Sequence, residues 1–398
     1  MIQISKPEII YIDNKARLKA EIEIDAKKNT IWFEVDKKYG NYLCSERSDA
    51  FVIGILSYAM RNGHDITCAA PMGEELYYKI TTQLIEAIYK GSGNLHKTVI
   101  TADIDSTELP TSNAVGTGIS CGIDSFHVLS QQTNSQLKKH NVTHLTFNNV
   151  GSHGQGEHAI KLYNERKLLA LKFAKEFEFE LVESNSNIYD IIPQDHSLTH
   201  SYTSSFCIYS LQKLYSIYYY ASGHTFLEFS LIDNDKKDSS YYDLLTTCMF
   251  STKSLTIISE GATSSRLEKT EKVTMYEPSY NYLNVCTITA SNCSKCEKCT
   301  RTLVALDALG KLDLYKNVFD IEYYKKHCQR YYSSMVKEVL WKNSSYVQVY
   351  AILKSKVSTT AKLKGFAQAY SPYISRFIPK FLKISIRKSL SFVNISRN

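Results

Sequence analysis

The order of apolar and polar residues over the first 112 positions predicts strands that alternate with helices. Short segments rich in Ile, Val, Thr and aromatic residues, bounded by polar turns, are typical of strands. Segments of this kind lie at 9–12, 20–24, 30–35, 65–70 and 97–100. Apolar residues at helical spacing predict two helices, at 49–60 and 74–89. The polar residues after Pro110 mark the end of a predicted N-terminal α/β domain, residues 1–112.

The same alternation resumes at Ala114 and continues to about residue 315. We expect strands at 144–148, 180–183 and 226–230, and helices at 126–136, 159–177 and 206–220. Strands that alternate with helices predict a doubly wound parallel sheet, which binds ligands at the carboxyl ends of its strands. The sequence therefore predicts a second α/β domain over 113–315, and a helical and basic C-terminal extension over 316–398.

Composition and charge refine this picture without assigning a substrate. The chain is 43% hydrophobic and 12% aromatic, which allows a sizeable core. It shows no signal peptide and no apolar run of transmembrane length, so a cytoplasmic location is expected. The net charge of +7 comes from the tail, since residues 351–398 carry ten Lys or Arg and no Asp or Glu. A nucleic acid partner is therefore not indicated, although the segment 374–388 can lie on a membrane surface, contact RNA or a partner, or simply pack.

A loop of small and hydroxyl residues, Gly118 to Ser125, follows an apolar segment and precedes a helix. This arrangement binds phosphate, because the first amides of a helix lack intrahelical partners and the helix dipole favours an anion. Asp124 would repel a bare phosphate, which implies a bridging Mg²⁺. The alternative is an ordinary strand-to-helix turn capped by Asp124 or Ser125.

The loop Ser120-Cys121-Gly122-Ile123-Asp124-Ser125 resembles the SGGxDS loop of the PP-loop (N-type) ATP pyrophosphatases. That resemblance implies an adenine nucleotide alpha hydrolase-like fold and an ATP site made of these six residues. Cys121 stands in place of a glycine, a replacement that we expect to be tolerated if Cys121 has a negative φ. A glycine-rich segment at 153–158 follows the next predicted strand and is expected at the same edge, and its Gly154-Gln155 resembles a glycine-glutamine pair of 7-cyano-7-deazaguanine synthases.

Four cysteines form the most specific motif of the chain: Cys286, Cys293, Cys296 and Cys299. Two overlapping CxxC units and a fourth cysteine supply a tetrahedral set of thiolates for Zn²⁺. A site of four cysteines leaves no coordination position for water, so we expect a structural role. An iron–sulfur cluster is the rival occupant.

The order of these features is similar to that of the 7-cyano-7-deazaguanine synthase family, over about residues 114 to 315. A charged segment at 266–273 places Lys269 where PP-loop enzymes have a lysine that faces the ATP phosphates. The resemblance implies an ATP-dependent ligase that adenylates a small or protein-borne carboxylate, as in relatives from bacterial defence systems, and then transfers nitrogen from ammonia. Catalytic roles would fall to Asp124 and Lys269, with ATP, Mg²⁺ and Zn²⁺ as cofactors and a homodimer left open.

Two alternatives stay open at this point. A tRNA thiolation enzyme of the same superfamily would need a reactive cysteine near the loop, for which Cys121 and Cys207 are candidates. A zinc-stabilised nucleotide-binding module without catalysis would need neither. The sequence leaves the acceptor unassigned.

Overall fold

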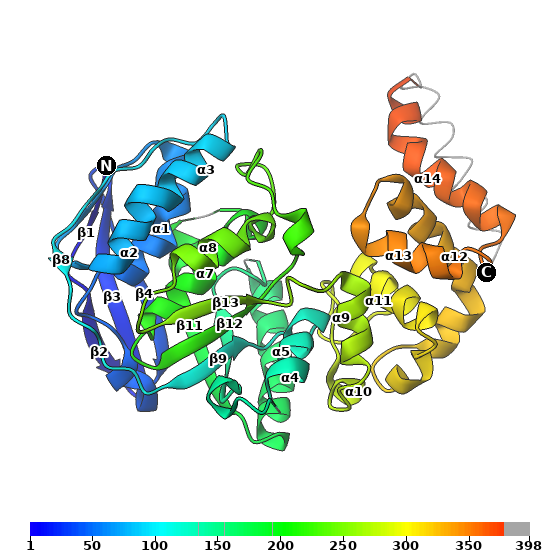
Figure 1. Cartoon of the computed structure of the whole chain (residues 1–398), viewed down its shortest axis with the longest axis horizontal. Helices are drawn as coiled ribbons and strands as arrows, with labels where there is room; N and C mark the ends of the chain where they lie inside the picture. Colours follow the sequence, from blue (N-terminus) through cyan, green and yellow to red (C-terminus); the bar gives the residue numbers. More distant parts are fainter. Residues whose placement is uncertain (134, 155, 193, 378–398) are drawn as a thin grey trace. The chain divides into compact units, whose positions relative to one another are not determined.

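The computed structural model describes residues 1–133, 135–154, 156–192 and 194–377 (Figure 1). Its contacts divide the chain into two compact units, with the boundary between Asn284 and Val285. The first unit is an α/β structure, and the second is helical over its described residues.

One large sheet organises the first unit. Within the described residues its strands are β1 (Ile2–Ile4), β2 (Glu8–Ile12), β3 (Lys15–Ile24), β4 (Lys27–Asp36), β5 (Ile66–Cys68), β7 (Ile100–Thr101), β9 (Ala114–Gly118), β10 (His144–Asn149), β11 (Glu180–Ser186), β12 (Tyr215–Ala221) and β13 (Thr256–Glu260). Their order is β13-β12-β9-β10-β11-β4-β3-β1-β5-β7, with β2 beside β3. A separate pair joins β6 (Met72–Gly73) to β8 (Ile104–Asp105).

Five neighbouring strands of this sheet, β9 to β13, run parallel to one another. β9 is the first of them in the sequence. The chain continues from β9 to β10 and β11 on one side, and later to β12 and β13 on the other. The point between β9 and β12 is thus a topological switch point, where parallel α/β sheets hold their ligands. The predicted α/β class with parallel strands is confirmed for this part of the chain.

The first unit also contains helices. They are α1 (Asp49–Asn62), α2 (Glu74–Lys79), α3 (Ile85–Gly91), α4 (Ile123–Gln132), α5 (Glu157–Glu176), α6 (Ile188–Ile191), α7 (His196–Ser210), α8 (Asp243–Met249), α9 (Arg266–Val273) and α10 (Ser279–Tyr282). Several of them contact the sheet: α4 contacts β12 and β9, α5 contacts β10 and β11, and α6 contacts β4. A π-helical turn, Ile80–Leu84, joins α2 to α3. The predicted end of the first helix is confirmed, because Gly63 follows α1 in the left-handed conformation.

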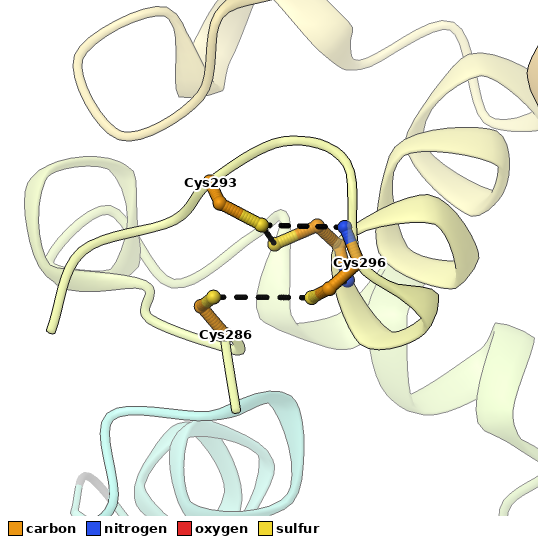
Figure 2. Close-up of side chains that lie close together, drawn as sticks. Cys286, Cys293 and Cys296 are labelled. Atoms are coloured by element: carbon orange, nitrogen blue, oxygen red, sulfur yellow. Dashed lines mark hydrogen bonds between the residues drawn. The ribbon is translucent and has the colours of Figure 1, made fainter. Parts of the chain in front are cut away.

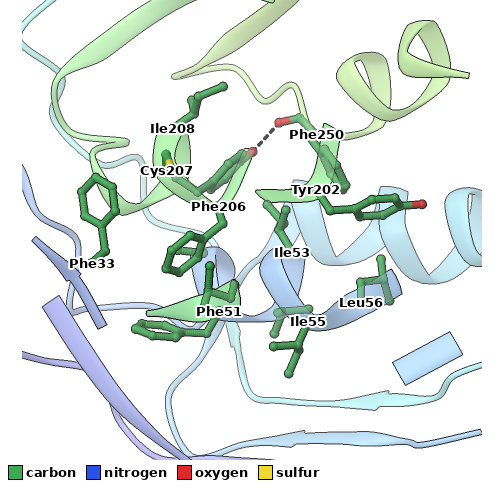
Figure 3. Close-up of a cluster of buried hydrophobic side chains, with 14 of the residues drawn as sticks. Phe33, Phe51, Ile53, Ile55, Leu56, Tyr202, Phe206, Cys207, Ile208 and Phe250 are labelled. Atoms are coloured by element: carbon green, nitrogen blue, oxygen red, sulfur yellow. Dashed lines mark hydrogen bonds between the residues drawn. The ribbon is translucent and has the colours of Figure 1, made fainter. Parts of the chain in front are cut away.

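The structure groups the chain differently from the predicted division at residue 112. β4 pairs with β11 in antiparallel register, Val35 opposite Ser184, so the sheet is continuous across that position. The hydrophobic core is continuous as well. Phe206 of α7 packs edge-on against Phe33 of β4 and Phe51 of α1 (Figure 3). Residues 1–112 therefore share one core with the residues that follow.

Two sequence-based expectations are wrong. The helix expected at 206–220 is the end of α7 followed by strand β12, because Ile217 and the tyrosines from Tyr215 onward favour the pleated conformation. Tyr215 and Tyr218 pack closely over Gly116 of β9, where a Cβ would lie 2.7 Å from each ring. The strand expected at 226–230 is a 3₁₀ turn that opens with a capping box between Thr225 and Glu228.

The second unit holds the four cysteines and the C-terminal helices. The helices are α11 (Glu297–Ala308), α12 (Ile321–Leu340), α13 (Ser344–Leu353) and α14 (Thr359–Phe377). The helical expectation for 316–350 is confirmed. Residues 378–388 of the basic segment lie outside the described residues. Over the part of the chain that the structure describes, we find no helix with the length and apolar character of a membrane span.

Candidate nucleotide site and candidate metal centre

The predicted phosphate loop connects β9 to α4 at the switch point of the sheet. Ile119 stays in register with the sheet, since its amide donates to the Thr146 carbonyl at 2.9 Å. Ser120 is exposed, whereas Cys121 and Ser125 are buried. The loop closes on itself, because Gly122 N and Ser125 Oγ each lie 3.3 Å from Ser120 Oγ. The predicted order of strand, loop and helix is confirmed here.

Cys121 has a left-handed backbone, with φ of +56°. The condition stated for this replacement in the PP-loop resemblance, a negative φ at Cys121, is therefore not met. The conformation is one that glycine adopts without strain, so the loop has a glycine-like backbone that carries a thiol. Its carbonyl accepts a 2.7 Å hydrogen bond from the amide of Asn284, which fixes the turn. Burial raises the pKa of the Cys121 thiol to about 12.

The start of α4 lacks a side-chain cap among the described residues. The N-cap residue is Gly122, so neither Asp124 nor Ser125 occupies the capping position. Ser125 Oγ instead donates to the Gly122 carbonyl at 3.1 Å, and the N-cap position is held by Gly122 itself. Helices α7, α9 and α12 begin at side-chain caps supplied by Asp195, Ser265 and Asp320, whereas α1 and α5 begin without one, as α4 does. An uncapped helix start can direct its amides at an external anion.

Two cations from α9 converge on Asp124 of the loop. Arg266 Nη1 lies 2.7 and 2.6 Å from the two carboxylate oxygens, and Lys269 Nζ lies 3.5 Å from one of them. Arg266 and Lys269 are three residues apart and so share one face of α9. The structure thus brings together two predicted site residues, Asp124 and Lys269. It also adds Arg266, which the spacing to Lys269 could have indicated.

Lys269 is only 2% exposed, so its ammonium needs internal partners. It donates a 2.6 Å hydrogen bond to the carbonyl of Ser222, the residue after β12. The Ser222 hydroxyl in turn lies 3.4 Å from the carboxylate of buried Asp243. Burial raises the pKa of Asp243 to about 6, although Ser259 Oγ donates to it at 3.1 Å. Sequence reasoning missed Ser222 and Asp243, because β12 was expected to be a helix.

His127 of α4 is a buried group next to this site. Among the described residues neither of its ring nitrogens has a hydrogen-bond partner. Burial, reinforced by the charges of Lys269 and Lys272, lowers the pKa of His127 to about 4. A Cβ on Gly261 would lie 3.0 Å from His127 Nδ1 and 3.1 Å from Lys269 Cε. Gly261 therefore leaves room for both side chains.

An open depression of about 680 Å³ lies beyond β10 and β11. Its lining residues come from the loop after β10, from α6 and from the start of α7: Gly151, Ser152, His153, Gly154, Tyr189, Gln194, Asp195 and His196. Burial lowers the pKa of His153 and of His196 to about 4, so both imidazoles are neutral at pH 7. The glycine-rich segment predicted at this edge thus lines a concave surface. Gln155 lies outside the described residues.

Next to His196, His200 is fixed by two partners. Its Nδ1 lies 2.5 Å from the Tyr220 hydroxyl, and its Nε2 lies 2.7 Å from Asp238 Oδ1. The rings of His196 and His200 are 5.7 Å apart. Burial acts to raise the pKa of Asp238, but the hydrogen bond and charge of His200 outweigh it and lower this pKa. A polar chain thus extends from the depression to the end of β12.

The four predicted metal ligands converge in the second unit, with their sulfurs within 4.8 Å of one another. Cys286 Sγ lies 3.8 Å from Cys296 Sγ (Figure 2). Cys293 Sγ lies 4.0 Å from Cys299 Sγ. A zinc ion at about 2.3 Å from each sulfur would space them by about 3.8 Å. The cluster therefore has the dimensions of a tetrahedral metal site and can hold a metal such as zinc.

Backbone amides support these sulfurs. Cys293 Sγ accepts from the amide of Cys296 at 3.2 Å, and Cys296 Sγ accepts from the amide of Cys299 at 3.5 Å. The second contact also caps α11. Burial acts to raise the pKa of Cys286, but hydrogen bonds from Thr289 and nearby amides outweigh it and lower this pKa to about 6. Such contacts stabilise the thiolate form of Cys286, whereas burial raises the pKa of Cys293 and of Cys299.

Comparison with protein-family models, with curated proteins and with solved structures found no match to this chain.

Proposed function

We propose that this chain is an ATP-dependent carbon–nitrogen ligase of the PP-loop type, related to the 7-cyano-7-deazaguanine synthases. Its parallel strands would form an adenine nucleotide alpha hydrolase-like sheet. It would adenylate a carboxylate, release pyrophosphate, and replace AMP by nitrogen from ammonia. The observation that carries the proposal is the uncapped start of α4 at the switch point, beside Arg266 and buried Lys269.

Each loop residue has a role that follows from its position. The first amides of α4 and the exposed Ser120 hydroxyl would donate hydrogen bonds to the phosphates that leave as pyrophosphate, while buried Ser125 would hold the loop through its bond to the Gly122 carbonyl. Arg266 and Lys269 would neutralise the charge that develops on this leaving group. Asp124 is the single carboxylate of the loop and is already paired with Arg266, so an Mg²⁺ would be held mainly by phosphate oxygens. Mg²⁺, when bound, would supply charge neutralisation at the phosphates.

The depression beyond β10 and β11 supports an acceptor site at the same edge of the sheet. Its neutral histidines and the Ser152 hydroxyl can donate and accept hydrogen bonds. The proposed acceptor is either a small carboxylic acid or a carboxylate carried by a protein. Ammonia is the proposed nitrogen donor.

The four-cysteine cluster would hold zinc as a structural ion. Four thiolates complete the coordination shell, so this ion would take no part in the chemistry. Its proposed effect is on the folding of the second unit, because metal binding and folding share one free energy in small metal-bearing domains.

The thiolation alternative has less support. Burial raises the pKa of the Cys121 thiol to about 12, and burial also raises the pKa of Cys207. A nucleophilic thiolate needs a lowered pKa and access to the substrate. Neither cysteine meets these conditions.

Pyrophosphate release tests the ligase. The purified full chain with MgATP and ammonia would be screened against a panel of carboxylic acids, with AMP and pyrophosphate quantified together. We expect equal amounts of both products with one acid class, and their loss in Asp124→Asn and Lys269→Gln. Lys175→Gln on the exposed side of α5 is the matched charge control and should retain full turnover. ATP binding without product for any acceptor, including peptides, would favour the non-catalytic module.

A further inference from the structure

Helix α14 has one face that packs and one that does not. Ala361, Gly365 and Ala369, spaced four residues apart, are buried. A Cβ on Gly365 would lie 2.6 Å from the Ser333 carbonyl oxygen and from Val336 Cβ, so the small residues allow close contact with α12. Figure 1 shows α14 against α12. The face of α14 that carries these small residues is therefore buried against α12 within the second unit.

The opposite face of α14 exposes large apolar side chains. Leu363, Phe366 and Tyr370 are 67%, 54% and 41% exposed. At 100° per residue they form one stripe, and the Phe366 and Tyr370 rings are 4.5 Å apart. Exposed Lys362 and Lys364 lie on opposite sides of this stripe. Adjacent apolar side chains of this size on a monomer mark an interaction surface.

The charge of the surrounding sequence is one-sided. Residues 351–398 contain ten Lys or Arg and no Asp or Glu. We propose that α14 docks on an anionic lipid surface, with Leu363 and Phe366 entering the acyl boundary. Lys362 and Lys364 would contact the headgroups on either side. A helix that pairs an apolar stripe with flanking lysines binds in the plane of such a surface.

Lipid fits this face better than RNA or a folded protein. RNA would engage the lysines but would leave Leu363 and Phe366 in water. The apolar stripe is a convex ridge on a helix whose other side is packed, so a protein partner would need a matching groove. An anionic bilayer accepts apolar and cationic groups on the same surface without such a groove.

Sedimentation with vesicles tests this inference on the full chain. Vesicles of phosphatidylcholine alone would be compared with vesicles that contain 30% phosphatidylserine, a composition of about that proportion giving a strongly negative surface. We expect binding to the anionic vesicles and little to the neutral ones. Leu363→Gln with Phe366→Gln should lower the partition coefficient at least about tenfold. Lys362→Gln with Lys364→Gln should lower it roughly tenfold in low salt.

Leu227→Gln is the control, because Leu227 is 98% exposed on the first unit and lies in the 3₁₀ turn Phe226–Glu228 instead of on α14. It should bind vesicles like the unmodified chain. Thermal melts that match among the variants would show that they are folded. The inference is overturned if anionic vesicles are not bound, or if the Leu363 and Phe366 double variant binds them unchanged. It is equally overturned if only single-stranded RNA is bound and only the lysine variant weakens that binding.

Discussion

Arg266 Nη1 lies within hydrogen-bonding distance of both carboxylate oxygens of Asp124, at 2.7 and 2.6 Å. The negative charge of the loop is thus compensated by the protein itself. A phosphate can therefore approach the α4 start without facing an unpaired carboxylate. Because α9 supplies this positive charge, the loop and α9 are held together by an ion pair.

A double-mutant cycle measures the coupling free energy between Asp124 and Arg266. Asp124→Asn, Arg266→Gln and the double variant would be unfolded in urea. We expect a coupling free energy of about 1 to 2 kcal/mol, because the pair is largely buried and charge-assisted. The pair Lys90 and Glu86, 3.1 Å apart on α3 with Lys90 70% exposed, should couple more weakly. A coupling at Asp124 no larger than this control would contradict the interpretation.

Metal removal should affect the second unit. We expect about one zinc ion per purified chain by elemental analysis. Cys286→Ser or Cys299→Ser should abolish this content and lower the melting temperature of the second unit. Cys328→Ser on α12, outside the cluster, should leave zinc bound. Iron with sulfide in place of zinc would assign the rival cluster.

The left-handed Cys121 makes a conformational prediction. Cys121→Gly should change stability by less than about 1 kcal/mol, because relief of backbone strain offsets the loss of a small buried side chain. Cys121→Val should cost more than about 2 kcal/mol, since a β-branched residue resists positive φ. Urea unfolding of both variants would check the order. A valine variant as stable as the glycine variant would show that the turn has relaxed to a negative φ.

The thiol of Cys121 should also resist modification. Because burial raises its pKa to about 12, we expect iodoacetamide to leave it unlabelled in the native state at pH 8. Mass spectrometry would locate the label, and exposed Cys248 serves as the reactive control. Rapid labelling of Cys121 would restore the thiolation alternative.

His127 predicts a pH dependence of stability. Its pKa is lowered from 6.5 to about 4 in the folded state, so its contribution is present above pH 6.5 and is lost as the pH falls toward 4. Between pH 7 and 4.5, His127→Leu should lose less stability than the unmodified chain, by on the order of 2 kcal/mol. Exposed His158→Leu is the control and should follow the unmodified chain. Parallel pH profiles for both variants would contradict the burial of an uncharged imidazole.

The buried carboxyl of Asp243 changes stability with pH in the opposite direction to His127. Burial raises its pKa from 3.8 to about 6, so its contribution is present below pH 3.8 and is lost as the pH rises through 6. The pH profile of the whole first unit therefore combines opposing slopes. The effect of His127 on stability is therefore measured as the difference between the pH profiles of the His127→Leu variant and the unmodified chain.

The sequence predicted those parts of the site that depend on local order. The loop between β9 and α4 and the four cysteines are contiguous patterns, whose geometry follows from spacing alone. The ion pair of Arg266 with Asp124 spans 142 positions and depends on how α9 packs against α4. No local pattern encodes such packing, although the shared face of Arg266 and Lys269 gave a partial signal.

Sequence reasoning went furthest wrong where aromatic residues dominate. Tyrosine is compatible with a helix and favourable in a strand, so tertiary context decided β12. That context is Gly116, whose missing side chain admits Tyr215 and Tyr218. The predicted domain boundary at residue 112 does not separate two hydrophobic cores, for a related reason. A polar connection indicates a loop, whereas the pairing of β4 with β11 is non-local.

This pairing has a practical consequence. Removing residues 1–112 would uncover the backbone of Ser184, Asn185 and Ser186, now matched to Val35, Glu34 and Phe33. An exposed edge strand can pair with the same strand of another chain, and such pairing leads to aggregation. Recombinant pieces that start after residue 112 should therefore be insoluble, and the first 112 residues are best regarded as a built-in cover for the edge of strand β11.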